Sequence, residues 1–479
     1  MKKPKCTGTQ RFWNRRDFLA SMGGGLGLLA LNQLLHADAL RSSDGLHHKA
    51  TAKRVLLLFM SAGVSHIDTF DRKPALQKFD GKPMPGIENE KDVFFRTPGV
   101  LMKSPFRFAQ HGRSGKWVSE LFPHQAKIVD DVAFVHSMVA EQNSHAPACY
   151  HFFTGQSRTG SPSLGSWISY GIGSETENLP SYVVLADRGS PPGSSANWSN
   201  GYLPARFQGT LFRGEGDPII DLKPPSKFSA ETQQATFEYL RKLNEEHLKK
   251  HPNDSELAAR IAAYELAAKM QLSAPQAADL SKESAQTISN YGMDRSDRAQ
   301  AGFSRLCLLG RRLLERGVRF VTIFCGGSNN VPDQNWDGHE NLEKNHRRNA
   351  LICDQPIAAL IQDLKARGMW DDTLVIWSGE FGRTPTSEGG KGRDHNIRGF
   401  TSWLGGGGIR EGISFGATDE LGFRAVENPV SIADFHATIL HTLGIDHKRL
   451  TFLHSGGHQR LTGVHGEVVG GLLKSPPEP

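Results

Sequence analysis

Carboxylate and imidazole side chains follow each of three apolar runs in this chain of 479 residues. The set comprises Asp68 after residues 55–60, Asp337 and His339 after 319–327, and Glu380, Asp394 and His395 after 371–379. Such a mixture of oxygen and imidazole nitrogen donors suits a divalent cation of the Zn or Mn type. The residue types therefore predict a metal site, provided that the ends of the three runs meet in the fold.

The middle group has the most informative spacing. Asp337 and His339 are two residues apart, so an extended chain places both side chains on the same side. The alternative is a polar loop whose groups are simply solvated. Asp68 has an alternative of its own, because aspartates commonly cap turns.

The stretch IWSGEFGRTP, residues 376–385, ends an apolar run in Glu380 and Arg383, and GRDHN follows at 392–396. A strand would hold Glu380 rigidly, as a metal ligand requires. Arg383 and Arg393 offer planar guanidinium groups that bind an anionic ester in a bidentate manner. The alternative is an Arg–Glu ion pair that only stabilises a loop.

Ser144 and His145 stand at the start of a predicted helix over 145–153. Helix N-termini attract anions through their free N–H groups and the helix dipole. Either side chain is therefore a candidate to attack an ester or to hold it. The alternative is an ordinary serine cap.

Apolar runs alternate with helical patterns, most clearly over 303–318, 319–327, 349–368 and 371–379. This alternation predicts an α/β fold with a mostly parallel central sheet flanked by helices on both faces. In such sheets ligands bind at the carboxyl ends of the strands, where the three groups fall. We expect a single domain over 53–475, with a helical insertion at about 230–300.

The first residues are typical of an export signal. Arg15 and Arg16 precede an apolar stretch over 19–35, and Ala37 and Ala39 give an A-x-A cleavage pattern. The paired arginines favour the twin-arginine route, with a signal peptide over 1–39. The alternative is a membrane-anchoring helix. We expect a periplasmic or secreted protein with no stable membrane span after cleavage.

The net charge of +6 gives little support to a nucleic-acid partner. Residues 1–39 contain six Lys or Arg and two Asp, which leaves +2 for the rest of the chain. A charge this small does not indicate a nucleic-acid surface. The sequence does not indicate an oligomeric state.

Several longer motifs together resemble one family, the exported family called domain of unknown function 1501, placed in the alkaline phosphatase and sulfatase superfamily. The resemblance covers almost the whole chain. Besides the twin-arginine start and GRDHN, it rests on SHIDTFDRKP, TGQSRTGSPSLGSWISYGIG, WDGHENL, CDQPIAALIQDLKARGMWDDTLVIWSGEFGRTP and GGHQRLTGVHGEVVGGLL.

The resemblance implies an alkaline phosphatase-like fold with one or two divalent ions, Zn, Mn, Ca or Mg. The implied metal ligands are Asp68, Asp337, His339, Glu380, Asp394 and His395. His145 or Ser144 would act as nucleophile or anion holder, and Arg383 and Arg393 would neutralise charge on the transferred group. Two features depart from the superfamily pattern: Phe381 stands where a second metal-binding residue is expected, and no Cys-x-Pro-Ser-Arg motif is present.

The resulting prediction is an exported, metal-dependent hydrolase of an anionic ester, sulfate or phosphate. The substrate would be a small molecule or a polysaccharide ester. Without Cys-x-Pro-Ser-Arg, a formylglycine sulfatase is not expected. The alternative is a non-catalytic binding protein that keeps the fold and part of the metal site.

Overall fold

The structure is a computed structural model that describes residues 46–86, 99–186, 189–214, 218–219, 229–250, 255–327 and 334–475. The predicted signal peptide over 1–39 lies outside the described residues. Among the helices that are described, none has both the length and the apolar character needed to cross a membrane.

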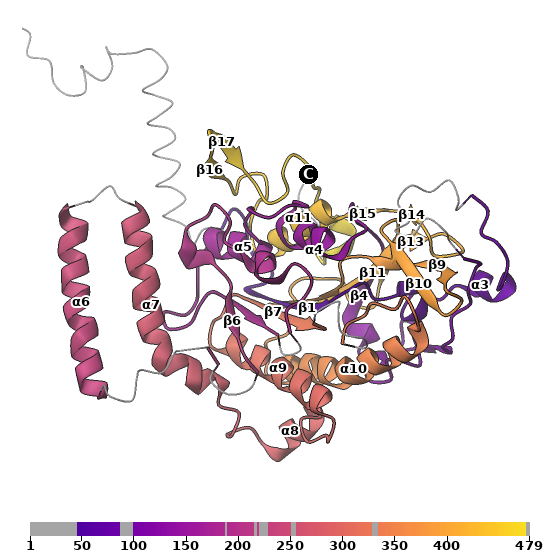
Figure 1. Ribbon diagram of the computed structural model, residues 1–479, viewed down its shortest axis with the longest axis horizontal. Helices are drawn as coiled ribbons and strands as arrows, with labels where there is room; N and C mark the ends of the chain where they lie inside the picture. Colours follow the sequence, from indigo (N-terminus) through magenta and orange to yellow (C-terminus); the bar gives the residue numbers. More distant parts are fainter. Residues whose placement is uncertain are drawn as a thin grey trace, which may run out of the picture. The chain divides into compact units, whose positions relative to one another are not determined.

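A nine-stranded mixed sheet forms the centre of the unit that spans His47–Pro479 (Figure 1). Its strand order is β12-β4-β11-β8-β1-β7-β5-β6, and β15 pairs with β4. Strands β8, β1, β7, β5 and β6 run parallel, while β11 is antiparallel to both β8 and β4. The bounds are β1 Arg54–Met60, β4 Val132–Val139, β5 Tyr182–Leu185, β6 Thr210–Phe212, β7 Phe320–Cys325, β8 Thr373–Ser378, β11 Phe400–Gly405, β12 Ser414–Phe415 and β15 Val430–Ser431.

The central strand β1 shows why this sequence needs helices on both faces. Its residues Val55 to Met60 are all buried, because successive side chains of a strand point to opposite faces. Leu56 and Leu58 pack in one hydrophobic cluster, whereas Leu57 and Phe59 pack in another. An apolar strand of this kind is stable only between two covered faces.

Helices cover both of these faces. Helices α9 and α10 contribute to the cluster that contains Leu56, and α4, α5 and α11 contribute to the cluster that contains Leu57. Their bounds are α4 His145–Thr154, α5 Leu164–Ile172, α9 Arg298–Glu315, α10 Leu342–Ala366 and α11 Ile432–Thr442. The predicted α/β class, a mostly parallel sheet flanked by helices, is confirmed.

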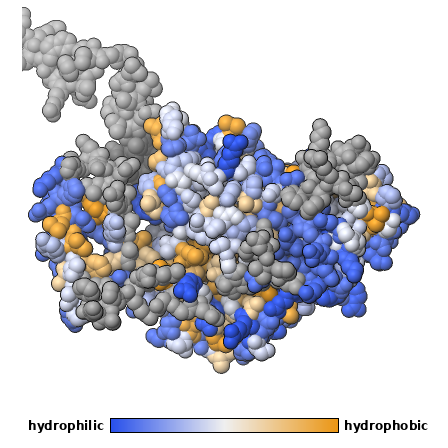
Figure 2. All heavy atoms as spheres, in the orientation of Figure 1, coloured by the Kyte–Doolittle hydropathy of each residue, from blue (hydrophilic) through white to orange (hydrophobic). Residues whose placement is uncertain are grey.

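Two long helices occupy the segment in which an insertion is expected: α6 Ala230–Lys250 and α7 Ser255–Ala278, followed by α8 Ala285–Tyr291. Exposed Leu240 and Leu243 lie on α6. Figure 2 shows hydrophilic residues over most of the visible face, with apolar residues more frequent towards the side of α6 and α7.

The remaining elements are short. They include one α-helix, α3 Pro74–Lys78, and four two-stranded ribbons: β2 Phe108–His111 with β3 Lys116–Ser119, β9 Gly382–Glu388 with β10 Gly392–Asn396, β13 Ala417–Thr418 with β14 Ala425–Glu427, and β16 Phe452–His454 with β17 Gly457–Gln459. The polar stretch 382–396 gives no strand signal, yet it forms the β9–β10 hairpin. Its backbone groups pair with each other, so polar residues are held extended without an apolar alternation.

Candidate metal centre

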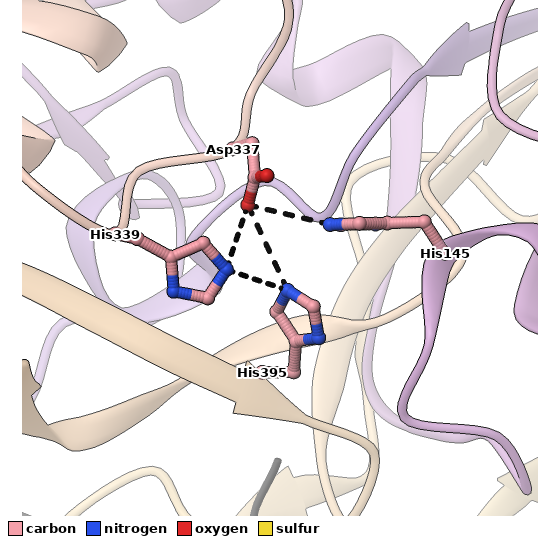
Figure 3. Close-up of side chains that lie close together, drawn as sticks. All are labelled: His145, Asp337, His339 and His395. Atoms are coloured by element: carbon pink, nitrogen blue, oxygen red, sulfur yellow. Dashed lines mark hydrogen bonds and ion pairs between the residues drawn. The ribbon is translucent and has the colours of Figure 1, made fainter. Parts of the chain in front are cut away.

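Four side chains from three distant segments converge at one point (Figure 3). Asp337 and His339 come from the loop between β7 and α10, His395 comes from β10, and His145 is the first residue of α4. Each offers one ligand atom, and these atoms all lie within 4.8 Å of one another. The sequence-based prediction named all four residues, and the structure brings them together.

The spacing of the ligand atoms suits a four-coordinate ion. Asp337 Oδ1 lies 3.3 Å from His145 Nε2, 2.9 Å from His339 Nε2 and 3.7 Å from His395 Nε2. His339 Nε2 and His395 Nε2 are 2.8 Å apart. Ligands about 2.0–2.1 Å from a tetrahedral Zn²⁺ are separated by about 3.3 Å, which falls within this range of separations.

The second ring nitrogen of each histidine faces a hydrogen-bond acceptor. His145 Nδ1 lies 2.7 Å from Glu380 Oε1, His395 Nδ1 lies 2.6 Å from the carbonyl oxygen of Asn143, and His339 Nδ1 contacts Glu388. Because a carbonyl oxygen can only accept, His395 Nδ1 carries the hydrogen, and its Nε2 presents a lone pair when the ring is neutral. Carboxylates at Nδ1 favour the same tautomer in the other two rings.

The donor set therefore fits a cation on chemical grounds. Lone pairs of two Nε2 atoms facing each other at 2.8 Å repel unless a positive charge lies between them. His145 Nε2 is buried and makes no hydrogen bond, although Asp337 is 3.3 Å away. A divalent ion held by the three Nε2 atoms and Asp337 Oδ1 would satisfy all four groups.

The electrostatic environment favours the ligand forms of Asp337 and His395 near neutral pH. Burial would raise the pKa of Asp337, but the positive charge of Arg383 outweighs it and holds that pKa well below its usual range. Burial, together with Arg383, lowers the pKa of His395, which keeps the ring neutral as a ligand must be. His145 differs: burial opposes its charge, but the neighbouring carboxylates of Asp337 and Glu380 raise its pKa, so an ion would have to displace a proton from this ring.

Hydrogen bonds of the backbone fasten the loop that carries Asp337 to the β9–β10 hairpin. Arg393 N donates to Gly338 O at 3.1 Å, and Leu342 N donates to Lys391 O at 3.0 Å. The approach is so close that a Cβ at position 392 would lie 1.4 Å from His339 O, so only glycine fits there. The register of the hairpin shifts between Arg393 and His395, and such a bulge re-aims a side chain.

The structure places Glu380 behind His145 rather than among the converging atoms. Its Oε1 contacts His145 Nδ1, and its Oε2 accepts a hydrogen bond from Ala62 N at 3.1 Å. Both oxygens of Glu380 are thus engaged, and one of them orients a candidate ligand. Carboxylates of this type fix the orientation and raise the basicity of metal-bound histidines.

The structure does not bring Asp68 to the convergence point. Asp68 and Arg393 form an ion pair of 2.7 Å in which neither side chain is exposed. Ser65 Oγ donates to Asp68 at 2.5 Å. The other N–H groups of Arg393 bond to the carbonyl oxygens of Thr384, Pro385 and Met102. Arg393 therefore has no N–H left for a substrate, and the pair supports the hairpin.

Arg383 lies at the edge of the centre, and most of its N–H groups are bonded within the protein. Its guanidinium donates to the carbonyl oxygens of Gly63, Arg393 and Ala62, and to Asp337 Oδ1 at 2.7 Å. It lies 3.2 Å from His339 Nε2. Arg383 thus fixes the carboxylate and lowers its pKa.

Two further predicted residues lie next to the centre. Asp394 accepts a hydrogen bond from His395 N at 2.7 Å and forms a second group of close ligand atoms with His339 and Glu388. Ser144 is the N-cap of α4, and its side chain makes no capping bond. The residues on either side of it, Asn143 and His145, both contact the centre.

Sequence reasoning missed three contributors to the site. Glu388 and the carbonyl of Asn143 orient two of the rings, and Phe381 packs against both His145 and His395 at ring distances of 5.0 and 4.5 Å. Glu388 lies in a polar hairpin without a strand signal, and a backbone carbonyl leaves no sequence signal. Phe381 is visible in the sequence only as a departure from the superfamily pattern.

The fold and the site define an α/β protein with a candidate centre for one divalent ion, built from three histidines and one aspartate. The chain belongs to the family described as protein of unknown function (DUF1501), whose model matches residues 52–473. The family predicted from the motifs is therefore confirmed. No curated protein matches the sequence.

Three solved structures illustrate what the fold is similar to. The lipoteichoic acid synthase LtaP of Listeria monocytogenes has 11% identity and a TM-score of 0.36, covering 89% of this chain and 80% of its own. The PsFucS1 sulfatase of Pseudoalteromonas sp. has 12% identity and a TM-score of 0.36, with coverage of 87% and 71%. A variant of TAB5 alkaline phosphatase has 10% identity and a TM-score of 0.34, with coverage of 82% and 98%.

Proposed function

We propose that this protein is an exported, metal-dependent hydrolase of a sulfate or phosphate ester. One observation carries the proposal: three imidazole Nε2 atoms and Asp337 Oδ1 converge, while each ring Nδ1 faces an acceptor and Arg383 donates to Asp337 Oδ1. Histidines whose second ring nitrogen is hydrogen-bonded to an acceptor are typical of metal centres. The twin-arginine pattern is the support for export.

The donor set favours Zn²⁺ or Mn²⁺ over Ca²⁺ or Mg²⁺, because imidazole nitrogen is a poor ligand for the harder ions. A bound divalent ion would act as a Lewis acid on an ester oxygen. The residues that would hold it are His145, Asp337, His339 and His395. Asp394 and Glu388, beside His339, are candidates for a second ion.

Ser144 is the best candidate for a nucleophile or anion holder among the predicted residues. It starts a ten-residue helix whose N-terminus favours negative charge. Its side chain makes no capping bond, and its neighbour His145 is held between Glu380 and Asp337. We therefore assign His145 a ligand role and leave the direct contact with the ester to Ser144.

The competing proposal is a metal-containing binding protein without turnover. The observation that favours it is the use of all five N–H groups of Arg393, and of four of those of Arg383, by acceptors in the protein other than the candidate ligand nitrogens. Arg393 has no N–H for a transferred group, and Arg383 has at most the one that faces His339 Nε2. A substrate anion would then depend on the ion and on the start of α4.

The experiment combines elemental analysis with assays on aryl sulfates and aryl phosphates. The purified protein is expected to contain one divalent ion per chain and to hydrolyse one of the two ester classes. His339→Ala should lose both, whereas Ser144→Ala should keep the ion and lose most of the turnover. His247→Ala, an exposed histidine on α6, is the control and should keep both.

Metal without turnover in the wild-type protein would favour the binding protein. A metal-free protein that cannot be loaded with Zn²⁺ or Mn²⁺ would contradict both proposals. Turnover that survives in Ser144→Ala would remove the nucleophile assignment alone.

A further inference from the structure

Two motifs that do not enter the metal centre meet around a cavity of about 780 Å³. They are the segment at 155–157, from TGQSRTG, and the segment at 460–467, from RLTGVHGE. The two are more than 300 residues apart in the sequence. Leu461 O lies so close to Gly155 that a Cβ there would be 2.3 Å away, so the segments are in direct contact.

The cavity wall is polar and of mixed charge. It carries three carboxylates, Glu141, Asp434 and Glu467, and two cations, Lys448 and Arg460. Lys448 already pairs with Glu467 at 3.2 Å. Three carboxylates against two cations leave the wall with a slight excess of negative charge, which disfavours a ligand with several anionic groups.

Several groups are positioned to exchange hydrogen bonds with a ligand. Arg460 Nε donates to Gly463 O at 2.7 Å, which fixes the orientation of the guanidinium. Gln156 is exposed at the rim. Gly463 and Gly466 have φ values of 58° and 92°, so the backbone turns here without side chains to cover it. The wall therefore offers both donors and acceptors, although Asp434 already accepts hydrogen bonds from Ser431 and from Glu467 N.

Helix α4 joins this cavity to the metal centre. His145, at its first position, belongs to the centre, whereas His151 and Gly155 line the cavity. Six residues of helix span about 9 Å. In Figure 1, α4 lies beside α11, which contributes Asp434, and His436 on α11 bonds to Phe152 O at 2.7 Å. The two sites therefore have a fixed separation.

We propose that this cavity binds a carbohydrate unit of the substrate, next to the unit whose ester reaches the metal centre. Sugar hydroxyls both donate and accept hydrogen bonds, so they match a wall that mixes carboxylates, amide, guanidinium and backbone groups. The inference rests on the proposed function, because it names the substrate as a glycan ester.

The test is a binding titration of the full chain that needs no turnover. The probes are neutral and singly sulfated or phosphorylated oligosaccharides of two to six units, measured by calorimetry. At least one probe is expected to bind. Gln156→Ala and Arg460→Ala should weaken it about three- to tenfold for each hydrogen bond lost. Arg113→Ala, whose side chain is 97% exposed outside the cavity, is the control and should bind normally.

Arg460→Ala could also disturb the loop, because Arg460 donates a hydrogen bond to Gly463 O. Gln156→Ala is therefore the second variant, since it tests binding without removing that bond. Binding that is unchanged in both variants, or no binding of any probe, would overturn the inference. A protein that holds metal and cleaves aryl esters but binds no oligosaccharide would refute the glycan site alone. A protein that binds oligosaccharide without metal or turnover would refute the proposed hydrolase and leave a carbohydrate-binding cavity.

Discussion

His339 Nε2 and His395 Nε2 lie 2.8 Å apart, although Nδ1 of each ring already faces an acceptor. Two neutral imidazoles arranged in this way direct lone pairs at each other. A proton on one of the two nitrogens or a cation bound by both would relieve this repulsion, and the convergence of Asp337 and His145 on the same point favours the cation. This contact is the basis of the metal proposal and of the first two predictions.

The first prediction concerns the ligands themselves. His395→Ala removes one of four donors and is expected to lower the affinity for Zn²⁺ at least as much as the loss of an outer partner, about 10- to 100-fold. Competition with a chromophoric chelator measures the affinity without any substrate. His454→Ala, at an exposed strand position, should match the wild type; an equal loss in both variants would contradict the assignment.

The second prediction concerns the carboxylates behind the rings. Glu380→Gln and Glu388→Gln keep the side-chain shape but remove the charge that orients His145 and His339. Each is expected to weaken Zn²⁺ binding by about 10- to 100-fold. Glu411→Gln, in an exposed pair with Lys474, is the control. Unchanged affinity in Glu380→Gln would mean that the carboxylate has no orienting role.

The third prediction separates a structural pair from the metal centre. Asp68→Asn leaves the buried charge of Arg393 unpaired, so we expect a loss of about 3–5 kcal/mol in the free energy of unfolding. The metal content of the folded variant should stay at the wild-type value. Asp372→Asn breaks an exposed pair with Lys53 and should cost less than about 1 kcal/mol. Loss of the ion from folded Asp68→Asn would restore Asp68 as a ligand.

The fourth prediction concerns stability in acid. His436 is fully buried, its Nε2 is 2.7 Å from Phe152 O, and burial lowers its pKa to about 4. In the unfolded chain it titrates near its usual value of about 6.5. Its contribution to stability is therefore complete above pH 6.5 and is lost as the pH falls towards 4.

Between pH 6.5 and 5 the loss from His436 amounts to about 2 kcal/mol, measured by urea unfolding at both pH values. His436→Gln should show a smaller loss over this interval. His247→Gln, on the exposed side of α6, should lose as much as the wild type. A slope in His436→Gln equal to that of the wild type would contradict the buried neutral state.

The sequence allowed prediction of the sheet and of the four converging side chains. Apolar runs such as 55–60 and 371–379 have few other ways to be buried, and parallel strands present their carboxyl ends together. Asp337, His339 and His395 follow from that edge. His145 was predicted as a nucleophile or anion holder and lies among the ligand atoms, because a helix start carries it to the same edge.

The division of roles among the charged residues could not be predicted. Asp68 and Glu380 have the residue type and the sequence position of metal ligands. In the structure, however, Asp68 forms an ion pair with Arg393, and Glu380 contacts His145 Nδ1. Which of two nearby partners a carboxylate takes depends on distances of a few ångströms, and these are set by the β9–β10 hairpin. The sequence of that hairpin shows no alternation of apolar and polar residues, so its register and its bulge could not be predicted from the sequence pattern.

Main-chain bonds between Gly338 and Arg393 and between Lys391 and Leu342 join two of the three donor segments without help from an ion, so we expect the scaffold to form in the metal-free chain. Chelation should consequently leave far-ultraviolet circular dichroism unchanged, unlike the collapse of a zinc finger. Folding would then not depend on metal binding, and the folded chain could acquire its ion in a later step.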